Sequence, residues 1–154
     1  MPFTDQHIAH FREFGYVAFP DFLSRRETDA LQAEVARFQR EGLVRNVHTD
    51  GDGRTPSSTR ANLQLIPLYD KSDLMRALPF KRRVLGAVEQ LIGNPLILHL
   101  DQMFLKPGRS GSGTDWHQDN AYFKIADPLM GTAMWLAVHD ATAVNGTLRV
   151  IPGS

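Results

Sequence analysis

Two side chains that could bind a metal ion stand two positions apart in the last third of the sequence, His117 and Asp119. Successive side chains of an extended strand point to opposite faces, so in a strand these two share a face and Gln118 points away. An imidazole and a carboxylate are two of the three ligands of a 2-His-1-carboxylate site, which leaves positions open on Fe(II) for a co-substrate and oxygen. The pair therefore suggests iron-dependent oxygenation. A surface pair or a buried hydrogen-bonded pair is the alternative for so short a motif.

Two helices near the N-terminus are predicted from their capping residues. Thr4 can cap a first helix, whose apolar residues recur at helical spacing and which ends at Gly15. A brief strand is expected at residues 16–19. Ser24 and Glu27 form a capping box for a second helix. The apolar stripe of this helix, which predicts core packing, consists of Leu31, Val35 and Phe38.

The elements that follow change from helical to strand character. Residues 43–61 lack periodicity and carry several turn formers, which predicts a solvated loop or a substrate lid. The glycine-rich stretch 107–114 fits no phosphate-loop spacing and is expected to be a hairpin connection that can move. The regular elements expected in this part are a strand at 62–66, a helical turn from Asp73, a third main helix at 80–91, and strands at 96–106, 116–123, 132–139 and 147–151.

Composition is that of an ordinary globular protein, and 154 residues predict one domain, residues 1–154. Lys+Arg and Asp+Glu number 17 each, so no net field attracts nucleic acid or an anionic membrane. No apolar run approaches the roughly 20 residues that span a bilayer, and the N-terminus lacks the pattern of a secretory signal. A cytoplasmic location is therefore expected. Because the sequence has no Cys, a metal ion would have to be bound by His and carboxylate.

Several segments resemble the phytanoyl-CoA dioxygenase family. They are residues 117–123, 134–142 and 145–154, together with residues 14–17 and 22–24 near the N-terminus. The resemblance implies an α+β protein in which N-terminal helices precede a double-stranded β-helix (jelly-roll, cupin-like) core. It also implies an oxidoreductase that uses Fe(II), with 2-oxoglutarate and O2 as co-substrates, to hydroxylate a small organic or acyl substrate.

The resemblance assigns expected roles to individual residues. His117 and Asp119 match the first two iron ligands of the family, and no further catalytic residue is assigned. Relatives that halogenate replace the carboxylate, so Asp119 favours hydroxylation. The residues expected to contact or lie near 2-oxoglutarate are Gln102, Trp135, Asn62 and Gln64.

Two features of the family lie beyond the matched segments, a second iron-binding His and an Arg that pairs with 2-oxoglutarate. The sequence ends at Ser154, so a C-terminally truncated dioxygenase with half of the barrel missing is expected, and this chain alone should turn over little substrate. His139 is expected to be an ordinary solvated residue at a strand end, because about 13 Å of strand separates its level from that of Trp135. A non-catalytic cupin-like binding or interaction module is the alternative. Exposed sheet edges would favour self-association in either case.

Overall fold

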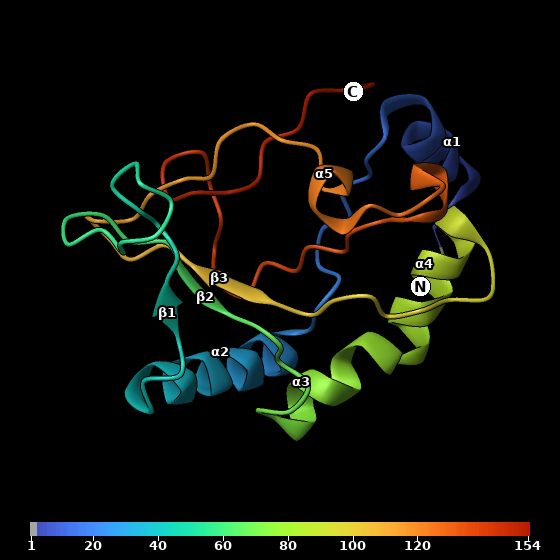
Figure 1. Cartoon of the computed structure of the whole chain (residues 1–154). Helices are drawn as coiled ribbons and strands as arrows, with labels where there is room; N and C mark the ends of the chain where they lie inside the picture. Colours follow the sequence, from blue (N-terminus) through green and yellow to red (C-terminus); the bar gives the residue numbers. More distant parts are fainter. Residues whose placement is uncertain (1–2) are drawn as a thin grey trace.

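The computed structural model describes residues 3–154. Its three strands form a small sheet. Helix α2 lies below the strands, and the C-terminal segment passes over the opposite side (Figure 1). The elements in chain order are α1 (Asp5–Phe14), α2 (Arg25–Arg40), β1 (Arg45–Asn46), β2 (Leu63–Leu65), α3 (Asp73–Ala77), the 3-10 turn η1 (Leu78–Phe80), α4 (Arg82–Ile92), β3 (Met103–Leu105), α5 (Asn120–Phe123) and the 3-10 turn η2 (Pro128–Met130).

The two predicted N-terminal helices are confirmed together with their caps. The side chain of Thr4 accepts from the backbone N–H of His7, and Gly15 ends α1 in the left-handed conformation with φ of 79°. In α2 the side chain of Ser24 accepts from the N–H of Glu27, while the Glu27 carboxylate accepts from the N–H of Ser24. Both boxes satisfy backbone donors that a helix start leaves without partners.

Helix α4 is held to the N-terminal part of the chain by polar contacts at both of its ends. Glu27, at the start of α2, lies 2.9 Å from Lys81 Nζ and 2.6 Å from Arg83 Nη2. Gln90, near the end of α4, accepts from the N–H of Phe3 at 2.7 Å and donates to its carbonyl at 3.2 Å. These contacts fix the position of α4 relative to α1 and α2.

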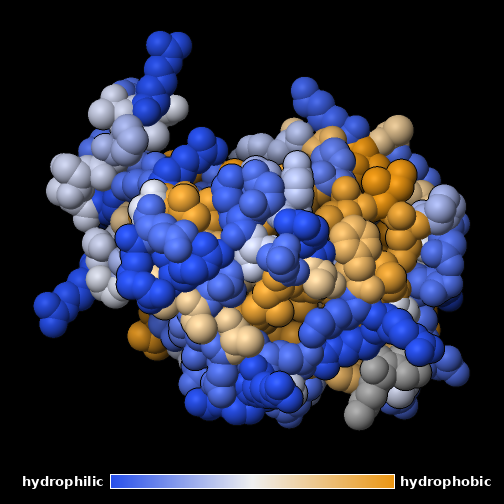
Figure 2. All heavy atoms as spheres, turned by 90° about the horizontal axis from the view of Figure 1, so that it is seen from below, coloured by the Kyte–Doolittle hydropathy of each residue, from blue (hydrophilic) through white to orange (hydrophobic). Residues whose placement is uncertain are grey.

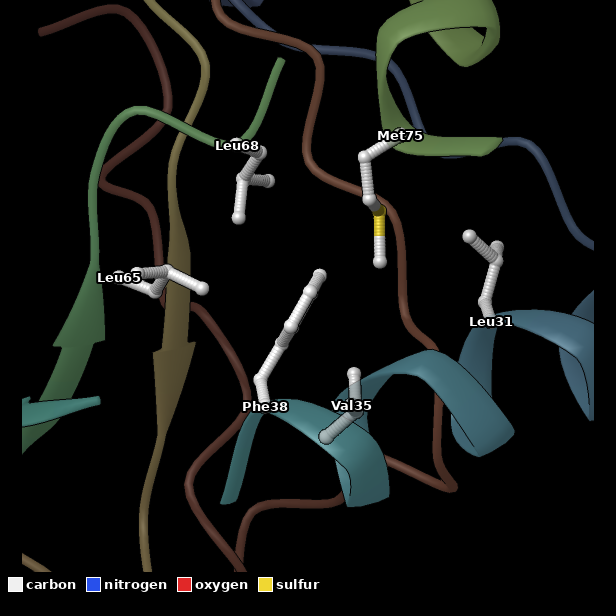
Figure 3. Close-up of a cluster of buried hydrophobic side chains, with 6 residues drawn as sticks. All are labelled: Leu31, Val35, Phe38, Leu65, Leu68 and Met75. Carbon is white, nitrogen blue, oxygen red and sulfur yellow. The ribbon is translucent and has the colours of Figure 1, made fainter. Parts of the chain in front are cut away.

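The main core lies between α2, the sheet and α3. The sheet is antiparallel in the order β1-β2-β3, and Leu63 of β2 stands opposite Leu105 of β3. The stripe predicted for α2 points into this core, where its members meet one residue of β2 and two that follow it (Figure 3). Phe38 is fully buried and Leu31 is nearly so. The six buried residues of the cluster are Leu31, Val35, Phe38, Leu65, Leu68 and Met75.

Several expected strands are wrong. Residues 16–19, 132–139 and 147–151 form no strand. Of the expected strand 116–123, residues 116–119 are irregular and Asn120–Phe123 form α5, and only Met103–Leu105 of the expected strand 96–106 is regular. Strand formation needs a neighbour that supplies partners for the backbone N–H and C=O groups, and in the described residues nothing pairs with the outer edge of β3. The α+β class is confirmed, whereas the three-stranded sheet of residues 3–154 does not confirm the jelly-roll core or the missing half of the barrel, which stay predictions. No helix in this range is long and apolar enough to cross a membrane.

The loop expected at residues 43–61 is more ordered than its sequence suggested. Thr49 forms an isolated antiparallel bridge with Pro56. At the tip between them, the Asp52 carboxylate accepts from the N–H groups of Arg54 and Thr55, each at 2.8 Å. The segment therefore forms a hairpin with its own hydrogen bonds, and its role as a solvated loop or a substrate lid stays a prediction.

The segment after α5 is largely irregular. Among the described residues, three hydrogen bonds attach it to the chain before α5. The attachments join Gln32 Nε2 to the Val138 carbonyl at 2.7 Å, Lys106 Nζ to the Gly146 carbonyl at 2.8 Å, and the Gly153 N–H to the Phe14 carbonyl at 2.9 Å. Most of the exposed large hydrophobic side chains lie in residues 97–151. Seen from below, hydrophobic atoms also reach the surface in a broad area between hydrophilic side chains (Figure 2).

Candidate metal centre

The structure brings the side chains of His117 and Asp119 together, although not in the predicted way. His117 Nε2 lies 3.3 Å from Asp119 Oδ1, and the two side chains are 34% and 52% exposed. Asp119 has helical backbone angles and directly precedes α5, whose first turn is closed by hydrogen bonds from Tyr122 and Phe123 to the Asp119 carbonyl. A turn that satisfies its own backbone groups replaces the expected strand, and it still leaves both side chains on one side.

The hydrogen bonds of His117 determine which nitrogen is available to a metal ion. Nδ1 lies 2.7 Å from the carbonyl oxygen of Asp115, and a carbonyl can only accept, so Nδ1 carries the proton. In the neutral ring Nε2 then presents its lone pair toward Asp119. Metal-binding His residues usually donate their other N–H to a carbonyl or carboxylate in this manner. The edge of the Tyr122 ring packs against the imidazole, with centroids 5.4 Å apart.

The spacing of the two donor atoms fits a shared metal ion. Two ligands about 2.1 Å from one ion, at angles of about 90–110°, are about 3.0–3.4 Å apart. The observed Nε2 to Oδ1 separation of 3.3 Å falls in this range. If the ring is neutral, the two lone pairs face each other, and a metal cation between them would remove the repulsion; if the ring is protonated, Nε2–H donates to Asp119 in an ion pair instead. The donor pair therefore fits part of a metal site, although the described residues contain no group of three His, Asp or Glu that could complete it.

Two of the amides expected near the co-substrate are brought together on the sheet. Gln64 Nε2, on β2, donates to Gln102 Oε1, just before β3, at 2.9 Å. Both side chains are half-buried. The bond leaves the Gln102 amino group and the Gln64 carbonyl oxygen available to a polar ligand.

The third expected amide connects the sheet to the metal pair. Asn62 is 6% exposed, and its Nδ2 donates to Thr114 Oγ1 at 3.4 Å. Its Oδ1 is buried and has no hydrogen-bond partner among the described residues. Thr114 stands three positions before His117. Neither Thr114 nor Asp115 was identified from the sequence, and the only available signal was a hydroxyl and a turn-forming residue at the end of the glycine-rich stretch.

The remaining candidates lie apart from this arrangement. Trp135 is 49% exposed in the extended segment after η2, and His139 is exposed at the end of that segment. Two shallow depressions were found elsewhere on the described surface. One lies between α2 and α3, lined by residues that include Ala33 and Leu74, and the other lies along α1 near His10. Neither is lined by His117 or Asp119, whose side chains are partly exposed.

Comparison with known proteins identifies one family. The family model described as phytanoyl-CoA dioxygenase (PhyH) matches residues 11–154. Similar proteins include an ectoine dioxygenase of Streptomyces avermitilis, 25% identical over 99% of this chain and 52% of its own length. An L-proline trans-4-hydroxylase of Streptomyces griseoviridis is 28% identical over 99% of this chain and 55% of its own length. Phytanoyl-CoA dioxygenase 1 of rice, Oryza sativa subsp. japonica, is 43% identical over 98% of this chain and 64% of its own length. The chain thus spans about half to two thirds of these relatives, and no solved structure matches it.

Proposed function

Because the chain belongs to the phytanoyl-CoA dioxygenase family, we propose that it carries part of the iron site of a 2-oxoglutarate-dependent dioxygenase. The reaction is the hydroxylation of a small organic or acyl substrate. The observation that carries the proposal is the His117–Asp119 pair, with donor atoms 3.3 Å apart and Nδ1 of the ring held by the Asp115 carbonyl. Relatives named as an ectoine dioxygenase and a proline hydroxylase support an oxygenase.

In this proposal each of the expected site residues has a role. His117 and Asp119 hold Fe(II), which when bound supplies the open positions for 2-oxoglutarate and O2. The half-buried amides of Gln64 and Gln102 would offer polar contacts to the co-substrate, whereas the buried amide of Asn62 donates to Thr114. Trp135 is the expected apolar wall of that pocket. Water exclusion at so exposed a pair requires further protein surface or the substrate itself.

The exposure and the donor count also bear on the activity of this chain alone. Two partly exposed donors bind a metal ion more weakly than three donors in a closed pocket, and the described residues supply no third. We therefore propose that the 154-residue chain by itself shows little turnover. Succinate released in proportion to a hydroxylated product would contradict this.

The second candidate function is a cupin-like module that binds a ligand or partner without catalysis. It is favoured by the missing third donor, because the described part of the chain contains no group of three metal-binding side chains. The two functions differ in whether Fe(II) binds at the pair.

The test is an anaerobic titration with Fe(II), with and without 2-oxoglutarate, followed by the visible charge-transfer band of the chelated keto acid. The band should appear with the natural chain and be lost in His117→Ala and Asp119→Ala. His139→Ala is the matched control, an exposed His outside the pair, and should leave the band unchanged. A folded chain that takes up no iron, or a band that survives both substitutions, would contradict the proposal and favour the non-catalytic module.

A further inference from the structure

The glycine-rich loop is docked onto the strand segment that precedes β2. The Ala61 N–H donates to the Ser110 carbonyl at 2.8 Å, and the Ser112 N–H donates to the Ala61 carbonyl at 2.9 Å. Ala61 and Gly111 form an isolated parallel bridge between these two bonds. The side-chain bond from Asn62 to Thr114 continues the same contact. We call this arrangement, residues 61–62 against residues 110–114, the clasp.

The loop that enters the clasp is compact, and the mobility expected from its sequence stays a prediction. The Gly111 N–H donates to the Pro107 carbonyl at 2.7 Å, which closes a tight turn. Arg109 within the turn adopts a positive φ of 70°. A Cβ atom at position 111 would lie 2.6 Å from the Pro107 carbonyl oxygen, so only glycine fits there. The turn therefore sets the direction in which the chain enters the clasp.

The clasp ends one residue before the carbonyl that holds His117. Thr114 is bonded to Asn62, and the next residue, Asp115, accepts from His117 Nδ1 at 2.7 Å. Fixing Thr114 limits the movement of the Asp115 carbonyl, and that carbonyl sets both the orientation of the imidazole and the nitrogen that carries its proton. The pair itself lies on exposed chain, whereas Asn62, to which Thr114 is bonded, is buried.

Burial makes Asn62 a suitable anchor for the clasp. An amide in this position leaves its Oδ1 buried and unpaired, at a cost typical of a lost hydrogen bond. Packing alone would favour an apolar side chain of similar size. The polar bond that the amide does make, to Thr114, is the contact that an apolar side chain could not provide.

We propose that Asn62 and Thr114 are positioning residues, which hold the His117 ring in the orientation and tautomer that metal binding requires. The role in metal binding rests on the function proposed above, whereas the orientation of the ring does not. Neither residue contacts the metal ion. Both act through the backbone between Thr114 and His117.

The experiment compares Thr114→Val with Ser112→Ala in the same chain. Thr114→Val removes the hydroxyl with little change of shape at an exposed position, so the fold should be kept. The Ser112 hydroxyl is bonded only to the neighbouring Gly113 carbonyl, at 3.4 Å, which makes Ser112→Ala a matched loss of a hydroxyl in the same loop. Two quantities are measured, the Co(II) dissociation constant from d–d absorption, and the 15N chemical shifts of the His117 ring in the metal-free protein.

Thr114→Val should weaken Co(II) binding by at most about fivefold, the effect of one ordinary hydrogen bond, because the Asn62–Thr114 bond is long at 3.4 Å. Its His117 shifts should move from a single Nδ1–H tautomer toward a mixture. Asn62→Ala should have the same two effects. The double variant should bind Co(II) no more weakly than the weaker-binding single variant, because both changes remove the same hydrogen bond. Ser112→Ala should match the natural chain in both measurements.

The outcomes separate this proposal from the function on which part of it rests. The positioning role would be overturned if the His117 shifts of Thr114→Val equalled those of the natural chain. Equal effects of Ser112→Ala and Thr114→Val would also overturn it. If the natural chain binds no Co(II) while the tautomer still changes in Thr114→Val, the positioning of the ring is supported and the proposed function fails.

Discussion

Substitution of Glu27 by Gln should lower the free energy of unfolding by about 2 kcal/mol. The carboxylate accepts from the N–H of Ser24, part of a cap worth about 1 kcal/mol, and Gln retains only a neutral version of this bond. It also lies 2.9 Å from Lys81 Nζ and 2.6 Å from Arg83 Nη2, contacts that carry up to about 1 kcal/mol each at partly exposed positions. For a chain of this length, 2 kcal/mol corresponds to a fall in Tm of about 6 °C.

The same contacts predict how the stability depends on pH. Hydrogen bonding to Arg83, then to the Ser24 backbone and Lys81, holds the pKa of Glu27 far below its usual value of 4.5. A carboxyl group with a lowered pKa in the folded state stabilises the fold above its unfolded pKa and loses this effect as the pH falls. The difference between the natural chain and Glu27→Gln should thus be full above about pH 4.5 and shrink below it.

Thermal unfolding followed by circular dichroism, over a series of pH values, measures both effects. Glu13→Gln is the control, because Glu13 is an exposed carboxylate in α1 that forms no ion pair within residues 3–154. It should unfold within about 1 °C of the natural chain, as surface substitutions usually do. An equal Tm for Glu27→Gln and the natural chain at neutral pH would refute the reasoning, and so would a difference that grows on acidification.

Three further predictions concern the core, the hairpin and the surface. Phe38→Ala, at a fully buried position, should lower the free energy of unfolding by about 3–5 kcal/mol in urea titrations, and a loss below about 1 kcal/mol would contradict the observed core. Hydrogen bonds from the Thr55 hydroxyl and from backbone N–H groups lower the pKa of Asp52 to about 2, so the Thr55 amide shift should titrate there; a midpoint near 3.8 would show that the hairpin tip is open. The exposed hydrophobic side chains of residues 97–151 and the absence of net charge should make copies of the chain associate, and a monomer in concentrated sedimentation runs would contradict this.

The helices were predictable because their signals are local. A capping box or a stripe at helical spacing lies within one or two turns, so Ser24 and Glu27 identify the start of α2 in any context. Strands depend on a partner that the local sequence does not name. Residues 132–139 have the composition of a strand, yet they form none, because no neighbouring strand in the described part of the chain pairs with them.

The proximity of His117 and Asp119 was predicted from the sequence, but the local structure that produces it was not. Alternation along a strand correctly placed His117 and Asp119 on one side, but a helical turn at Asp119 produces the result. The role of Thr114 depends on a contact with Asn62, 52 positions earlier, and such a contact leaves no pattern in one sequence. Gln64 and Gln102 could be grouped in advance only through resemblance to the family.

The attachments of the C-terminal segment affect how freely its side chains can change. In each attachment at least one member is a main-chain group, which is the same whatever side chain that residue carries. The side chains between two attachment points, such as those of residues 140–145, take no part in these hydrogen bonds. The path of residues 138–153 therefore depends on main-chain groups, and their side chains can be exchanged without loss of these three bonds.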